Sequence, residues 1–180
     1  MKTNKMLINF AVILACLLSF TFSANAQKRK APSRRTKPPA ATAPTTFLTN
    51  SEIKAGAEKV SIQIKNVSKF IYILGGVAQG IEDLDKDVKA GKVSRTASDQ
   101  NTKNKQAVIS TIANLRAGLI ALEVEFRTKP ALRNYNFQIQ GISDMTGTAE
   151  DQAAGGQLRE SGKTLLLVIE KLADTLAALP

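Results

Sequence analysis

The sequence predicts an all-α protein, an antiparallel helical bundle that follows a disordered basic linker. Apolar residues recur at spacings of three and four through most of residues 50–180, which is the repeat of one helix face. Almost no segment alternates polar and apolar residues as a half-buried strand does. The connections between the apolar stripes are short, which favours antiparallel neighbours. We expect four helices; a second interpretation has three, with residues 131–179 forming one helix that bends at glycine.

Residues 1–26 have the pattern of a secretory signal peptide. Lys2 and Lys5 give a basic start, an uncharged apolar stretch follows, and Ala24 and Ala26 supply the small residues of a cleavage site. The apolar stretch is slightly short for a transmembrane anchor. Cys16 lies inside it, where the sequence fits a lipoprotein box only loosely, so we expect cleavage after Ala26 instead of lipidation. The chain is then exported, either to the periplasm or outside the cell, and its mature form has no cysteine.

Residues 27–49 are predicted to form a disordered, extended linker. Prolines are interleaved with Ala, Ser and Thr, and the few apolar groups cannot offset the entropy of ordering this segment. Its cations have no acidic residue among them, and we expect them either to contact an anionic surface or only to keep a spacer solvated. These six cations are Lys28, Arg29, Lys30, Arg34, Arg35 and Lys37.

The first bundle helix is predicted by a long apolar stripe that ends near Gly91. Thr49 and Glu52 have the spacing of a capping box at its start. Lys89 and Gly91 suit its carboxyl end, where a cation and a glycine are both favourable. The stripe consists of Ile53, Ala57, Val60, Ile64, Val67, Ile71, Leu74, Ala78 and Ile81.

Three more helices complete the prediction. Ser98-Asp99 can cap the second, and Pro130 ends it; its stripe is Val108, Ile112, Leu115, Leu119, Leu122 and Phe126. A shorter third helix carries Leu132, Tyr135, Ile139 and Ile142, and ends near Thr146-Gly147. The fourth begins at Thr148, with acidic residues in its first turn. Its apolar face is formed by Leu165, Ile169, Leu172, Leu176 and Leu179.

The composition excludes several kinds of chemistry. The 180 residues include no His, no Trp and one Cys, so this chain alone cannot build a His/Cys zinc site, a His-ligated haem or a His-based catalytic triad. The formal charge of +10 is concentrated near the amino terminus, because residues 50–180 contain 17 basic and 15 acidic residues. A nearly neutral domain without aromatic platforms does not favour specific nucleic-acid binding.

Several short motifs imitate functional sites. Ser161-Gly162-Lys163-Thr164 resembles the end of a phosphate-binding loop, but the first glycine is misplaced and no strand precedes it. Asp83, Asp85 and Asp87 imitate a calcium loop that lacks its glycine and its final glutamate. A solvated helix face is the simpler interpretation, with Glu82 paired to Lys86 and Asp85 to Lys89.

Two other motifs are interpreted as structural. Gly76 and Gly80 form a Gly-x-x-x-Gly motif, from which we expect close packing inside the bundle or a kink at Gly75-Gly76. Glu123 and Glu125 cannot share a helix face, so they make a poor acid-base pair, and Glu123 more simply bridges Arg127. Tyr72 and Tyr135 are expected at the edge of the core with hydrated hydroxyls.

These observations predict an exported, non-enzymatic helical bundle of the cell envelope, a structural or interaction module. Its basic linker would attract an anionic surface, while its helix faces would bind a protein partner or a second copy. The alternative is a periplasmic chaperone-like protein that holds unfolded clients, which would need apolar residues exposed in a groove. We predict no catalytic residues, no cofactor, no metal and no membrane span in the mature chain, because no set of nucleophiles or metal ligands converges.

Overall fold

The computed structural model describes the backbone of residues 45–180 and the side chains of residues 49–180. Within this part of the chain the fold is all-α, with no strand and four long helices, which confirms the predicted fold class. The predicted signal peptide, including Cys16, lies outside the described residues, as does the predicted linker up to residue 44.

The four long helices differ greatly in length. They are α2 (Thr45–Lys89), α3 (Arg95–Thr128), α5 (Ile142–Ala154) and α6 (Leu158–Ala178). Two short elements connect α3 to α5, namely the 3-10 helix η2 (Arg133–Tyr135) and the single-turn helix α4 (Asn136–Ile139). Because α2 begins at Thr45, the last five residues of the predicted linker are helical.

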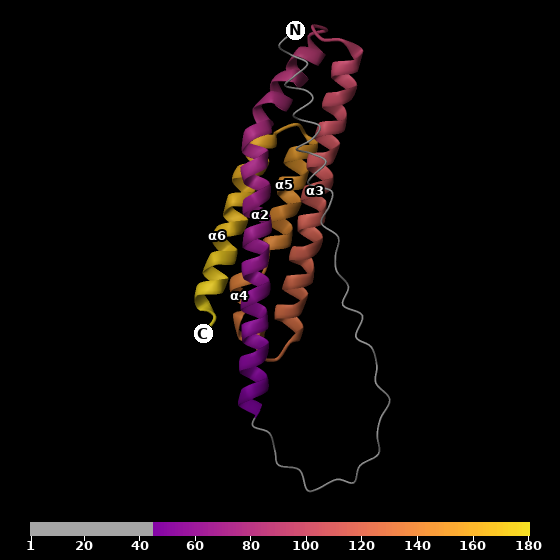
Figure 1. The fold of residues 1–180 in the computed structure, drawn as a ribbon. Coiled ribbons are helices and arrows are strands. Elements are labelled where there is room, and N and C mark those ends of the chain that lie inside the picture. The colour runs from indigo at the N-terminus through magenta and orange to yellow at the C-terminus, as the bar shows by residue number, and fades with distance from the viewer. Residues whose placement is uncertain (1–44) are drawn as a thin grey trace, which may run out of the picture. The chain divides into compact units, whose positions relative to one another are not determined.

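Neighbouring helices in the bundle are antiparallel (Figure 1). Contacts near both ends of α2 show this for α2 and α3, because Lys59 pairs with Glu125 and Asp85 pairs with Lys105. Helix α5 packs against both α3 and α6, and a short turn joins it to α6. The hairpin of α2 and α3 extends beyond that turn (Figure 1).

The predicted apolar stripes form the core. The stripe of α3 contributes Ile112, Leu119 and Phe126, all with no exposed surface, and the stripe of α2 contributes fully buried Val60 and Val67. On α6 the buried face is centred on residues 165, 168 and 172, slightly rotated from the predicted stripe, so that Val168 is buried and Ile169 is only half-buried. The remaining fully buried large side chains are Leu132, Ile139, Ile142, Leu158, Leu165 and Leu172.

The predicted end of the first helix is confirmed, whereas both predicted amino-terminal caps are wrong. Helix α2 ends at Lys89, and Gly91 follows at φ +68° while its amide donates to the Val88 carbonyl. Thr49 lies inside α2 and not at its start. Helix α3 begins one turn before Ser98, because the hydroxyl of Ser94 accepts a hydrogen bond from the Ala97 amide at 3.3 Å.

The predicted third and fourth helices have the wrong boundaries. The chain breaks at Gly141, and one continuous helix, α5, then includes Thr148, which was expected to start a new helix. Gly147 does not stop this helix; a Cβ there would lie 3.1 Å from the Arg116 guanidinium, so glycine allows Arg116 to lie close to α5. The actual break is at Gly156, at φ +79°, a conformation in which a side chain would be strained.

Helix α3 is long and apolar enough to cross a membrane by length and composition alone. This is weak evidence for a membrane span, because the core helix of a bundle satisfies the same criterion. In the structure α3 packs against α5, and its buried face includes the polar residues Asn101, Asn104 and Glu123.

Candidate functional site

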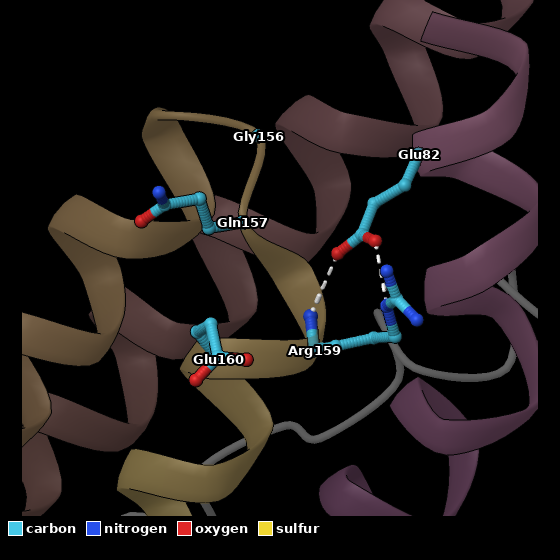
Figure 2. A pocket seen from close by; sticks show the side chains of 5 residues that line it. All are labelled: Glu82, Gly156, Gln157, Arg159 and Glu160. Carbon is cyan, nitrogen blue, oxygen red and sulfur yellow. Dashed lines mark hydrogen bonds and ion pairs between the residues drawn. The ribbon is translucent and has the colours of Figure 1, made fainter. Parts of the chain in front are cut away.

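An open pocket lies where the α5–α6 turn meets α2. It is lined by Glu82, Gly156, Gln157, Arg159 and Glu160 (Figure 2). Together with Asp85, Asn101 and Lys105, these residues form what we call the polar junction. The pocket lies beside the first turn of α6, where unpaired backbone amides and the helix dipole favour a negative charge.

Glu82 supplies that negative charge from another helix. One carboxylate oxygen of Glu82 accepts a hydrogen bond from the Arg159 backbone amide at 2.9 Å, and the other accepts from Arg159 Nε at 2.7 Å (Figure 2). The Glu82 side chain is only 11% exposed, whereas the Arg159 side chain is 60% exposed, so the carboxylate of this two-point contact is the shielded partner. Gln157, the residue at the N-cap, makes no capping bond of its own, and Glu82 takes over that role.

Asp85 forms the second half of the polar junction. Its Oδ2 atom accepts from Lys105 Nζ at 2.6 Å, and its Oδ1 atom accepts from the Asn101 amide at 2.9 Å. Asn101 also donates to the Ile81 carbonyl at 3.3 Å. A Cβ on Gly156 would lie 3.4 Å from Asp85 Oδ2, so the α5–α6 turn lies directly beside this carboxylate.

Two carboxylates of the polar junction, Glu82 and Asp85, are therefore engaged with other helices and not with their expected neighbours. Glu82 pairs with Arg159 of α6 and not with Lys86; Asp85 pairs with Lys105 of α3 and not with Lys89. Lys86 instead pairs with Asp83 at 2.9 Å, and this hydrogen bond and the lysine charge lower the pKa of Asp83. These ion pairs join α2 to α3 and to α6.

Two further polar contacts join helices at the opposite half of the bundle. Glu123 is buried and accepts from the Ser143 hydroxyl at 2.5 Å, so the predicted bridge from Glu123 to Arg127 is wrong. Glu125 of α3 forms ion pairs with Lys59 of α2 and with Lys129, the residue that follows the end of α3. As expected, the two glutamates do not share a helix face and contact different neighbours.

The remaining motifs lie on helices. Ser161 is buried within α6, Lys163 pairs with Glu160 at 2.8 Å, and Thr164 donates to Gln152 at 2.8 Å, so Ser161–Thr164 form part of a helix, as interpreted. Tyr135 packs against the core, whereas Tyr72 is 86% exposed and not at the core edge.

The glycines of α2 correct one of the two expectations for the Gly-x-x-x-Gly motif, close packing inside the bundle, whereas the expected kink at Gly75-Gly76 stays a prediction. Helix α2 continues through Gly75, Gly76 and Gly80, and all three glycines are exposed. A Cβ added at any of them would meet no atom within 4 Å. They therefore do not serve close packing inside this bundle.

The site residues predicted from the sequence lie outside the described part of the chain. These are the cleavage residues Ala24 and Ala26 and the six linker cations, Lys28, Arg29, Lys30, Arg34, Arg35 and Lys37. Within the described residues, no group of three or more acidic side chains is placed to hold a metal ion. The polar junction was missed because its pairs join distant segments; the Gly155-Gly156 dipeptide, a turn signal, could have indicated where the chain reverses.

The chain was compared with known protein families, curated proteins and solved structures. No protein-family model, no curated protein and no solved structure shows a significant match to the chain.

Proposed function

We propose that the protein is an exported, non-enzymatic module of the cell envelope that its basic segment draws to an anionic surface. The observation that carries this proposal is the segregation of charge. Six cations occur between residues 28 and 37 with no acidic residue, whereas residues 50–180 are nearly balanced. Such a segment attracts phosphates and other anionic groups without needing a fixed structure.

The ion pairs of the bundle support this division of roles. Lys59, Lys105, Arg116 and Arg159 each lie against a carboxylate of another helix. Cations paired in this way contribute little to the field at a distance, because the nearby negative charge cancels theirs. The basic segment is then the main source of positive potential in the mature chain, and attraction through it weakens as salt screens the charges.

Vesicle binding tests the proposal. The mature chain, residues 27–180, is mixed with vesicles of anionic phospholipid and with zwitterionic vesicles at low salt. We expect binding to the anionic vesicles only, with most of it lost at about 0.5 M salt, where the screening length falls to a few ångströms. Replacing the six linker cations by glutamine should abolish the binding.

A matched control removes the same charge from the bundle. It replaces six exposed cations, none of which makes an ion pair within residues 49–180, by glutamine: Lys54, Lys89, Lys92, Arg95, Lys103 and Arg127. We expect this variant to keep most of the binding. Equal loss in both variants would mean that total charge matters and not the basic segment, and no loss in the linker variant would refute the proposal. Mass spectrometry of the protein from cell fractions tests export, with Gln27 expected as the first residue.

The client-holding chaperone is the weaker alternative. Seven large apolar side chains of the described residues are exposed, but they are distributed over α2, α3, α4 and α6. A chaperone of this kind gathers such side chains on one continuous surface. We therefore expect the mature chain not to suppress the aggregation of an unfolded outer-membrane protein; clear suppression would favour the alternative.

A further inference from the structure

Three glycines on α2 are not explained by packing within residues 49–180. Gly75, Gly76 and Gly80 have helical backbone, are exposed, and have open space where a side chain would lie. A glycine inside a helix is less stable than alanine by up to about 1 kcal/mol. Other helical glycines lie close to a neighbour: a Cβ at Gly147 would lie 3.1 Å from Arg116, and one at Gly56 would lie 2.8 Å from Leu132.

The residues around Gly76 form one exposed helix face with a charge pattern that reverses at this glycine. Tyr72, Lys69 and Lys65 precede Gly76 by four, seven and eleven residues. Gly80, Asp83 and Asp87 follow it by the same three intervals. These intervals place all of them on one side of a helix. Every one is exposed, and we call this surface the α2 outer face.

We propose that the α2 outer face binds the same face of a second copy of this chain, with the two α2 helices antiparallel and a two-fold axis at Gly76. In this register each residue lies opposite the partner residue that is equally far from Gly76 on the other side of it in the sequence. Lys69 lies opposite the partner's Asp83, Lys65 opposite the partner's Asp87, and Tyr72 opposite the partner's Gly80. A two-fold interface of this kind must be self-complementary. The α2 outer face meets this condition, because its lysines lie on one side of Gly76 and its aspartates lie at the same intervals on the other side.

The residue types on the α2 outer face fit a second copy of this chain as the partner. Glycines at a helix crossing let two backbones approach closely. The Tyr72 ring, 86% exposed in the single chain, would cover the bare backbone at Gly80 of the second copy. Lys65, Lys69 and Asp87 make no ion pair within residues 49–180, so they are available, while Asp83 already pairs with Lys86 at 2.9 Å.

The charge pattern also selects the orientation. A parallel pair of α2 helices in register would place Lys65 and Lys69 against the same lysines and Asp83 and Asp87 against the same aspartates. Like charges at contact oppose association. Only the antiparallel arrangement converts all four positions into attractive pairs. The inference does not depend on the basic linker and stands apart from the proposed surface attraction.

Sedimentation equilibrium of the mature chain and its charge variants tests the pairing. We expect a weak, concentration-dependent dimer, because a single helix face makes a small interface. Lys69→Glu and Asp83→Lys should each weaken it about tenfold, since each change affects two symmetric pairs. The double variant restores both attractive pairs and should regain the affinity. The matched control is Lys103→Glu, an equal charge change at an exposed site on α3.

A glycine substitution separates assembly from folding. Gly76→Leu should raise the unfolding temperature of the single chain, because leucine favours helix and has open space there. The same change should abolish the dimer by blocking close approach. A monomeric native chain, a dimer unaffected by Gly76→Leu, or two charge variants whose combination fails to restore association would each overturn the inference.

Discussion

At the scale of single residues, Glu125 illustrates how two helices are joined by one carboxylate. Burial raises the pKa of Glu125, but hydrogen bonds and charges from Lys129 and Lys59 outweigh burial and leave the pKa below its ordinary value of 4.5. Lys59 belongs to α2 and Lys129 follows the end of α3. The ionised form of Glu125 is therefore stabilised by folding, which makes the stability of the bundle depend on pH.

The sign of this dependence follows from the lowered pKa. A carboxyl group with a lower pKa in the folded state contributes stability above its unfolded pKa and loses it as the pH falls through the folded pKa. We predict that Glu125→Gln reduces the free energy of unfolding at pH 6 but changes it much less at pH 3. Urea unfolding of both proteins at the two pH values measures this. Equal destabilisation at both values would show that the carboxylate charge is not responsible.

At the scale of elements, the amino terminus of α6 depends on a side chain from α2. Glu82 accepts from the Arg159 amide and guanidinium, and its side chain is largely buried. We predict that Glu82→Gln costs about 1–2 kcal/mol, because the helix dipole loses its compensating charge and a charge-assisted pair is lost. Thermal unfolding gives the value.

The neighbouring aspartate provides the matched control for Glu82. Asp83→Asn removes the same charge one residue away, but Asp83 and Lys86 are both more than half exposed. An exposed pair of this kind contributes little, so we expect a much smaller change than for Glu82→Gln. Similar effects of the two substitutions would contradict the capping role of Glu82.

The elements also show what the sequence could and could not predict. The core stripes of α2 and α3 were predicted correctly, because spacings of three and four depend only on the geometry of one helix. Gly91 was recognised as a helix end, whereas Gly147 was mistaken for one. A glycine that ends a helix and a glycine that admits a neighbouring arginine look alike in one sequence. The pairs of Glu82 and Asp85 were missed for the same reason, since their partners lie on other helices.

At the scale of the whole bundle, unequal helix lengths create a gradient of burial. The hairpin of α2 and α3 extends beyond the α5–α6 turn (Figure 1), and residues 86–100 include no buried residue. Further along α3, Val108, Ile112, Leu119 and Phe126 are almost completely buried. The polar junction lies where these two regions meet, with Asn101 hydrogen-bonded to Asp85 and to the Ile81 carbonyl.

Hydrogen exchange should reveal this gradient. Segments with few buried contacts open locally at a lower free energy than the core, which opens only with global unfolding. We predict that amides of residues 95–100 exchange on the order of a hundredfold faster than those of residues 108–126, although both lie in α3. Asp85→Asn should extend the fast-exchanging region toward Lys105, because it removes the ion pair at the base of the hairpin while the core of α3 stays protected. Uniform protection along α3 would show that the hairpin and the four-helix core unfold as one unit.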